Sequence, residues 1–166
     1  MFTDPNITAE LIGACALGFN IVAYRQNQMA RYLIFSGFSM ACLSLHFYLL
    51  EAFAAAIGCG LAALRNAVAL KSRASWVVVV FVTLNISAML IEYFVLQHGA
   101  LLFLAYCSGF IFTVGSIVIT QVEVMRRWFL VAEALGCLYA VIVGSVFGTI
   151  FNVVNMTNIV MKMRKH

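Results

Sequence analysis

Long apolar runs, separated by short polar segments, dominate the pattern of this chain. The runs cover residues 8–25, 31–50, 53–71, 75–97, 100–121, 127–144 and 147–163. Each is close to the roughly 17–25 residues with which an α-helix crosses a bilayer, since a helix rises about 1.5 Å per residue. The pattern therefore predicts an all-α polytopic membrane protein with seven transmembrane helices.

Two of the turns between these helices carry little polar sequence, and the length of the apolar stretch around each one predicts it. The 41 residues from Arg31 to Lys71 would form a helix of about 60 Å, twice the hydrocarbon thickness of a bilayer. The chain must fold back within this stretch, and Glu51 is the natural turning point. The 36 residues from Arg127 to Lys162 must also fold back, and GSVFG at 144–148 predicts the turn.

The composition supports the membrane interpretation. Hydrophobic residues make up 64% of the chain and charged residues only 10%, whereas a soluble domain carries about 25% charged residues. So few charges cannot cover a core with a solvated surface, and the outer surface is therefore expected to meet lipid. Pro5 is the single proline, so proline kinks are not expected in the helices.

The basic residues predict the orientation. In the seven-helix arrangement all ten Lys and Arg lie on or near one side of the membrane, and the opposite loops have none. Basic loops stay in the cytoplasm, so the N-terminus is predicted to be periplasmic and the C-terminus cytoplasmic. The basic residues do not form an arm or a stripe, so no nucleic-acid partner is expected. They are Arg25, Arg31, Arg65, Lys71, Arg73, Arg126, Arg127, Lys162, Arg164 and Lys165.

Residues that carry catalytic or cofactor chemistry are scarce. The five cysteines lie inside apolar runs with no CxxC spacing, and one histidine, His46, falls within a predicted helix interior. Paired carboxylates and a nucleophile–base spacing are also missing from the sequence. The sequence therefore predicts neither an enzyme nor a metal site or cofactor, and the expected partners are the lipid bilayer and a small solute.

Three pairs of similar segments indicate an internal repeat. LGFNIV at 17–22 matches SGFIFT at 108–113, an offset of 91; SLHFYLLEAF at 44–53 matches CLYAVIVGSV at 137–146, an offset of 93; and RNAVALKSR at 65–73 matches TNIVMKMRK at 157–165, an offset of 92. The near-constant offset predicts three-helix repeats at 1–73 and 99–166, joined by a linker helix at 74–98. Because one linker helix separates them, the two repeats are expected to be parallel, in a 3+1+3 arrangement.

Residues 44–81 resemble the YgjV-type bacterial inner-membrane proteins. The His-aromatic-aromatic-Leu-Leu segment at 46–50, the Arg65-Asn66 pair and the Arg73-x-x-Trp76 turn carry the resemblance. That family is similar in fold to the SWEET and PQ-loop transporters, which share the 3+1+3 plan. The resemblance implies an inner-membrane location and a transporter fold. The chain departs from the superfamily in having no Pro-Gln pair and none of its hinge prolines.

The resemblance implies that Asn66 and Asn158 are solute ligands, because SWEET-like carriers place an asparagine on each equivalent helix. A carboxamide both donates and accepts hydrogen bonds without adding charge. Asn152, Asn155 and Asn158 spread over about 120° of one helix, so they form one broad face that should avoid lipid. Asn155, on the same face as Asn158, is a third candidate solute ligand. The alternative is that these amides only join neighbouring helices, at about 0.6 kcal/mol each.

Arg65 and Glu133 are predicted to lie at the same depth. Each is six residues from a basic residue at the cytoplasmic boundary, which is about 9 Å along a helix. Matched depth and opposite charge suggest an ion pair that closes a cytoplasmic gate. The alternatives are an Arg65 side chain that extends to the interface and a Glu133 that is protonated or faces water. His46 aligns with Tyr139 and has either a proton-linked role or a packing role.

These features favour a transporter or facilitator of a small polar solute, neutral or zwitterionic because few charges lie near the amides. The alternative function is a non-transporting scaffold or partner subunit that retains a transporter fold. Two repeats in one chain could complete a carrier, and homo-oligomer formation is left open. The Ala- and Gly-rich sequence at 53–65 predicts a central packing position for its helix within the first repeat.

Overall fold

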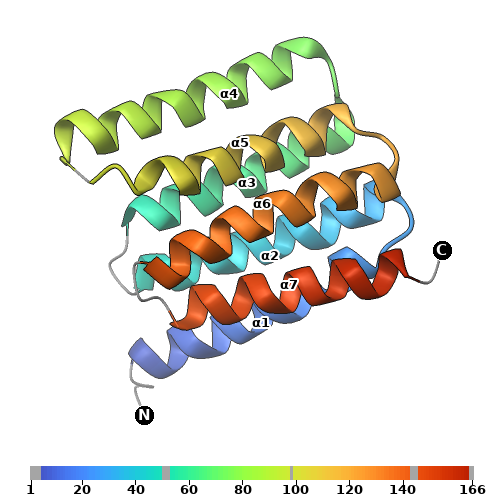
Figure 1. Ribbon diagram of the computed structural model, residues 1–166, viewed down its shortest axis with the longest axis horizontal. Coiled ribbons are helices and arrows are strands. Elements are labelled where there is room, and N and C mark those ends of the chain that lie inside the picture. The colour runs from blue at the N-terminus through green and yellow to red at the C-terminus, as the bar shows by residue number, and fades with distance from the viewer. Residues whose placement is uncertain (1–4, 50–52, 98, 143–145, 165–166) are drawn as a thin grey trace. The chain divides into compact units, whose positions relative to one another are not determined.

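The computed structural model describes residues 5–49, 53–97, 99–142 and 146–164, which form helices and short connections (Figure 1). The predicted all-α class is confirmed. The expected turns at Glu51 and Gly144 and the basic residue Lys165 lie outside the described residues. The elements are α1 (Pro5–Arg25), α2 (Met29–Leu49), α3 (Phe53–Lys71), α4 (Ser75–Leu90), the π-helix η1 (Ile91–Val95), α5 (Leu102–Val118), α6 (Val122–Ile142) and α7 (Val146–Met163).

The helix boundaries agree with the apolar runs to within a few residues, with one larger difference. Helix α6 begins at Val122 and not near residue 127, so Arg126 and Arg127 belong to its first turns and not to a loop. Between η1 and α5, Gln97 has a φ of 53°, in the left-handed region that L-residues other than Asn and Asp rarely adopt. Gln97 therefore lies at the turn that the gap between the apolar runs 75–97 and 100–121 predicts.

The chain forms two compact units, unit 1 (Met1–Lys71) and unit 2 (Ser72–His166). In unit 1, α1 packs on α2 and α2 packs on α3. The expectation that the Ala- and Gly-rich α3 is the central helix is wrong, because α2 contacts both neighbours. Its serines explain this position, since Ser39 hydrogen-bonds to α1 and Ser44 hydrogen-bonds to α3.

Small residues on one face of α1 allow the close contact with α2. Ala9, Ala16 and Ala23 are fully buried and are spaced seven residues apart, and Gly13 and Asn20 are buried between them. This alternating spacing of three and four residues is that of a helix–helix seam. In a membrane, small side chains at such a seam let two backbones approach closely.

In unit 2, the helices α4, α5, α6 and α7 pack in chain order, each against the next. Helix α4 packs on α5, and Val77 and Phe81 are its buried residues. Asn85 Nδ2 of α4 donates to Thr113 Oγ1 of α5 at 3.5 Å, and Tyr106 Oη of α5 donates to Glu92 Oε1 of η1 at 3.0 Å. Thus α6, like α2 in unit 1, lies between two helices.

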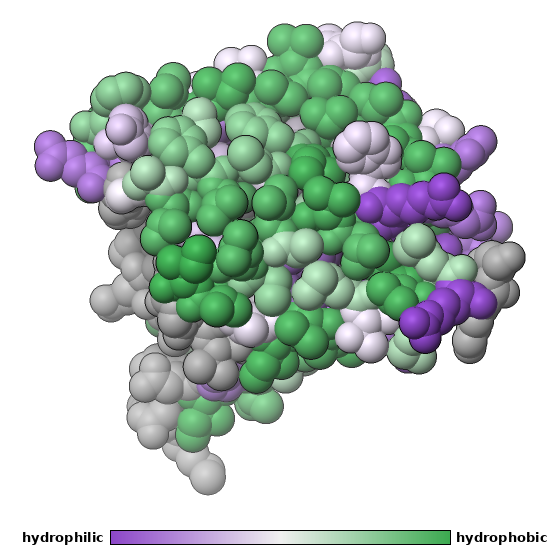
Figure 2. Space-filling view, viewed as in Figure 1, coloured by the Kyte–Doolittle hydropathy of each residue, from purple (hydrophilic) through white to green (hydrophobic). Residues whose placement is uncertain are grey.

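Several helices have the dimensions and surface of membrane spans. Among the described residues, Ile7–Arg25, Met29–Leu49 and Ser75–Val95 are long and apolar enough to cross a bilayer, and Leu102–Val118 is apolar but shorter. Large hydrophobic side chains on these helices remain exposed, and Figure 2 shows hydrophobic residues over most of the visible surface. An exposed apolar surface of this extent is what a lipid-facing protein presents.

Candidate functional site

A buried polar group in unit 1 is built around Asn66 of α3, which is fully buried. Asn66 Nδ2 donates to Ser36 Oγ of α2 at 3.0 Å. Its Oδ1 accepts from Arg65 Nη2 at 3.1 Å and from Arg65 Nε at 3.3 Å. We call Ser36, Arg65 and Asn66 the Asn66 cluster. One amide therefore joins two helices and also binds a guanidinium.

The second buried polar group lies in unit 2, between α6 and α7. Asn155 Nδ2, fully buried on α7, donates to Glu133 Oε1 of α6 at 3.0 Å, and Glu133 is itself 3% exposed. We call these two residues the Glu133 pair. Asn158 lies on α7 one turn closer to the C-terminus and is also buried. The predicted inward face of α7 therefore contains Asn155 and Asn158, and one of its amides binds a carboxylate.

The two groups share an arrangement but differ in charge. In each unit the amide belongs to the last helix and contacts the helix before it, α2 in unit 1 and α6 in unit 2. The associated ionic residue is Arg65 in unit 1 and Glu133 in unit 2, both buried. A charged side chain in the interior of a membrane protein is unfavourable unless it has partners, and such residues are commonly functional.

Asn152 occupies a packing position on α7. Its Nδ2 donates to the carbonyl oxygen of Gly148 in the same helix at 2.7 Å. Its Oδ1 lies against Gly136 of α6, only 2.8 Å from where a Cβ at that glycine would be. The amide therefore fits into the space that Gly136 leaves, as expected of a residue that joins two helices.

His46 packs between α2 and α1. Its Nδ1 lies 2.7 Å from the carbonyl oxygen of Ala9, and its ring covers Gly13, where an added Cβ would lie 3.0 Å from Nδ1. A carbonyl oxygen only accepts hydrogen bonds, so Nδ1 must carry the proton. This contact fits the packing role, and a proton-linked role of His46 stays a prediction.

Two interhelical contacts recur at equivalent positions with their side chains exchanged. In unit 1, Ser39 Oγ of α2 donates to the carbonyl oxygen of Ala16 at 2.7 Å. In unit 2, Ser108 Oγ of α5 donates to the carbonyl oxygen of Ala132 at 2.8 Å. Ala16 and Ser108 are 92 positions apart (108 − 16), and Ser39 and Ala132 are 93 apart (132 − 39).

The second exchanged contact joins α2 to α3 in unit 1 and α6 to α7 in unit 2. In unit 1, a Cβ at Gly60 of α3 would lie 3.3 Å from Ser44 Oγ of α2, and in unit 2 Asn152 of α7 fills the space above Gly136. Both pairs are offset by 92 positions (136 − 44 and 152 − 60). The glycine is on the last helix in unit 1 and on the middle helix in unit 2.

Sequence reasoning missed several of these residues. The serines at 36, 39, 44 and 108 are among them. A serine that faced lipid would have no hydrogen-bond partner, so a serine within an apolar run indicates a helix contact. The Glu92–Tyr106 hydrogen bond lies where α4 passes into η1, and the sequence contains no signal for a π-helix. The gap between the apolar runs 100–121 and 127–144 places Arg126 in a loop, whereas Arg126 is buried in α6.

The chain matches one protein family over nearly its whole length. The sequence pattern of Imp-YgjV, a bacterial inner membrane protein family, covers residues 7–166. The chain belongs to this family. The YgjV resemblance and the inner-membrane location are thereby confirmed. No curated protein and no solved structure matches the chain. Within the described residues of this family member, no group of three or more His, Cys, Asp or Glu side chains could hold a metal ion.

Proposed function

We propose that this inner membrane protein is a carrier or facilitator for a small polar solute, neutral or zwitterionic. The observation that carries the proposal is the burial of two ionic residues of opposite sign, Arg65 and Glu133, each hydrogen-bonded to an asparagine of its own unit. Ionic residues inside membrane proteins are rare and commonly mark solute and ion pathways.

Each group, within its own unit, has chemistry that suits a charged or polar part of a solute. A guanidinium binds a carboxylate through two parallel N–H donors, so Arg65 would bind a carboxylate of the solute. Glu133 would accept hydrogen bonds from an ammonium group, while the amides of Asn66, Asn155 and Asn158 would bind uncharged polar atoms. Phosphorylated solutes fit less well, because the two groups contain one carboxylate, Glu133, for one guanidinium, Arg65.

The proposal includes seven membrane spans in a 3+1+3 arrangement of SWEET type, with the N-terminus periplasmic and the C-terminus cytoplasmic. The exchanged contacts support a duplicated triplet, since Ser39–Ala16 and Ser108–Ala132 occupy matching positions. The one-sided distribution of Lys and Arg supports the orientation. Parallel repeats of this kind occur in known transporters.

A specific observation also favours the alternative, a scaffold that retains a transporter fold. Asn66 and Asn155 already have hydrogen-bond partners on the adjacent helix, which is all that a packing role requires. A carrier would have to exchange these contacts for contacts with its solute.

A ligand screen on purified protein distinguishes the two functions. The melting temperature would be measured in detergent with sugars, amino acids, nucleosides and vitamins, since a ligand at 100 times its Kd stabilises the folded state by about 2.7 kcal/mol. We expect a zwitterionic amino acid or a neutral solute to raise the melting temperature, and Asn66→Ala and Asn158→Ala to abolish the shift.

Asn85→Ala is the matched control, because Asn85 Nδ2 donates within α4 to the carbonyl oxygen of Phe81 at 2.7 Å and to Thr113. It removes an amide that is not part of the proposed site. An unchanged shift in both Asn66→Ala and Asn158→Ala would exclude the amide site. The absence of any stabilising solute, together with no uptake into proteoliposomes, would favour the scaffold.

A further inference from the structure

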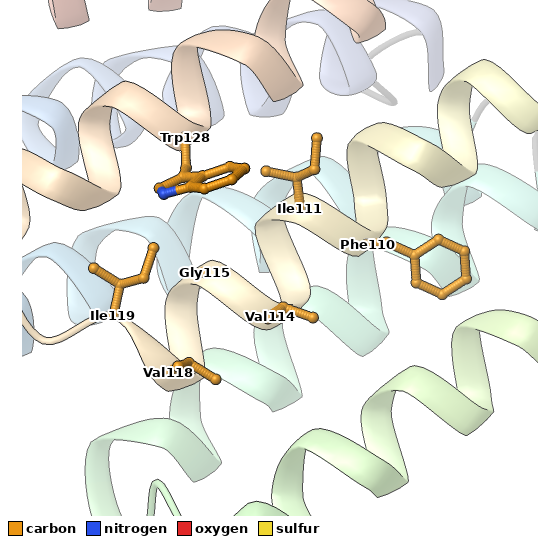
Figure 3. Close-up of a pocket in the computed structure, with 7 residues that line it drawn as sticks. All are labelled: Phe110, Ile111, Val114, Gly115, Val118, Ile119 and Trp128. Atoms are coloured by element: carbon orange, nitrogen blue, oxygen red, sulfur yellow. The ribbon is translucent and has the colours of Figure 1, made fainter.

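An apolar groove of about 400 Å³ lies along α5 and is closed on one side by α6, entirely within unit 2. Figure 3 shows the indole of Trp128, from α6, facing the stripe of α5 residues around Gly115, with Ile111 toward one end and Ile119 toward the other. The side chains that shape the groove are Ile111, Val114, Val118, Ile119 and Trp128. A polar solute would find no hydrogen-bond partner along such a wall except the indole N–H.

Gly115 lets α6 pack closely against α5 beside the groove. It falls between Ile111 and Ile119 at four-residue spacing, so one side chain is missing from the stripe. A Cβ at this position would lie 2.6 Å from the ring of Phe129, which is fully buried and contacts the ring of Phe112 at 4.8 Å. The absent side chain lets Phe129 pack against α5, while Trp128, the preceding residue, stays 54% exposed.

One end of the groove is held by an arginine. Ile119 follows α5, and its carbonyl oxygen accepts from Arg73 Nη1 at 3.2 Å. Arg73 lies in the connection before α4, and partial burial lowers its pKa from the ordinary value, although an arginine stays cationic at neutral pH. The guanidinium is thus fixed beside the last residue of the groove, and a guanidinium has five N–H donors in all.

The charges in the first turns of α6, the helix that supplies Trp128, are mainly positive. Arg127 is exposed and directly precedes Trp128, and Arg126 is buried in the same turn of α6. Glu123 is exposed in the first turn of α6 and is the opposing carboxylate there. Among the described residues at the start of α6 and in the connection before α4, Arg73 and Arg127 are therefore the cations that a ligand could reach, because Arg126 is buried. They outnumber the one exposed carboxylate, so an anion is favoured.

We propose that this groove binds one anionic glycerophospholipid, with an acyl chain along α5 and its phosphate hydrogen-bonded to Arg73 and attracted to Arg127. The apolar wall fits a hydrocarbon chain, and the guanidinium at its end fits the phosphate oxygens. Basic pockets between transmembrane helices on the cytoplasmic side are known to take anionic headgroups. The inference does not depend on whether the protein transports a solute.

Lipid binding would be measured by native mass spectrometry of the purified full-length protein, titrated separately with phosphatidylglycerol, cardiolipin and phosphatidylcholine. We expect one phosphatidylglycerol or cardiolipin to be retained much more tightly than phosphatidylcholine. Arg73→Gln should weaken phosphatidylglycerol binding roughly tenfold or more, the loss of one charge-assisted hydrogen bond. Val114→Phe, which fills the groove with a larger side chain, should remove the tightly bound lipid.

Two variants serve as matched controls. Arg31→Gln removes an exposed arginine of unit 1, and Val79→Phe enlarges an exposed valine of α4 that does not line the groove. Both should retain the lipid. Because mass spectrometry counts lipid on folded protein, a poorly folding variant is still informative. Equal retention by the wild type, Arg73→Gln and Val114→Phe, or equal binding of phosphatidylcholine, would overturn the proposal.

Discussion

At Asn66 and Asn155, a side-chain amide meets a charged group inside the protein. Asn66 Oδ1 accepts from the guanidinium of Arg65, and Asn155 Nδ2 donates to the carboxylate of Glu133. An amide can meet either charge because it carries both a donor and an acceptor. The same side-chain type therefore binds a guanidinium in unit 1 and a carboxylate in unit 2.

The Glu133 pair predicts a large stability loss on removal of its amide. Asn155→Ala leaves a buried carboxylate without this donor and should lower the free energy of unfolding by about 1–3 kcal/mol. Thr157→Ala is the control on the same helix, since Thr157 is exposed and Oγ1 donates to the carbonyl oxygen of Val153 in its own helix. Denaturant unfolding in mixed micelles measures both, and equal losses would contradict the prediction.

The exchanged serine contact can be tested by moving the hydroxyl between helices. Ser39→Ala should cost about 0.6 kcal/mol, a typical interhelical hydrogen bond in a membrane protein. Adding Ala16→Ser copies the arrangement of unit 2, where the serine is on the partner helix, and should recover part of the loss. If the double variant unfolds no later than Ser39→Ala, the two positions are not equivalent in geometry.

Between elements, close helix contacts depend on glycines that face large side chains. Gly115→Ala would place a Cβ 2.6 Å from Phe129, and Gly136→Ala would place one 2.8 Å from Asn152 Oδ1. We expect each to lower the free energy of unfolding by about 1–3 kcal/mol through overpacking. The loss at Gly115 should be the larger, since an aromatic ring in a packed interior moves less easily than an amide.

Gly18→Ala is the matched control for these two variants, because nothing lies within 4 Å of the added Cβ. It should be neutral or slightly stabilising, since alanine favours a helix over glycine by about 1 kcal/mol. Thermal unfolding in one detergent compares the three proteins. A Gly18→Ala protein as unstable as Gly115→Ala would contradict the packing explanation, because neither a close contact nor helix propensity predicts a loss at Gly18.

At the scale of the whole molecule, the orientation is open to direct measurement. A fluorescent-protein fusion after Arg164 should fluoresce, because the C-terminus is predicted to be cytoplasmic. A periplasmic phosphatase fused after Gln97, in the turn between η1 and α5, should be active. Both follow from the position of the basic residues. An active phosphatase at the C-terminus would contradict the seven-span proposal.

The ion pair between Arg65 and Glu133 stays a prediction from their matched depth in the sequence. Arg65→Glu and Glu133→Arg should each destabilise the protein and abolish solute uptake, because each places two like charges in the membrane interior. The double variant should recover stability if the two side chains pair. A double variant as impaired as each single one would contradict the pairing, and Glu10→Arg, on an exposed residue, controls for charge reversal alone.

The sequence by itself determined the helices, the membrane class and the family. A helix in lipid must satisfy its backbone hydrogen bonds internally, so each apolar run of sufficient length specifies its own element. The start of α6 was misplaced because Arg126 and Arg127 appeared to be loop residues, whereas Arg126 is buried within the helix. The length and polarity of an apolar run do not show that its helix begins before two arginines.

Only the tertiary structure decided which helices are neighbours and what each polar side chain meets. Composition favoured α3 as the central helix of unit 1, but the serines on two faces of α2 bring both neighbours to it. Likewise, Asn66 and Asn155 were identified from sequence, but Ser36 and Glu133 were not identified as their partners. A side-chain contact depends on the rotation and depth of two helices together, and neither is encoded within one apolar run.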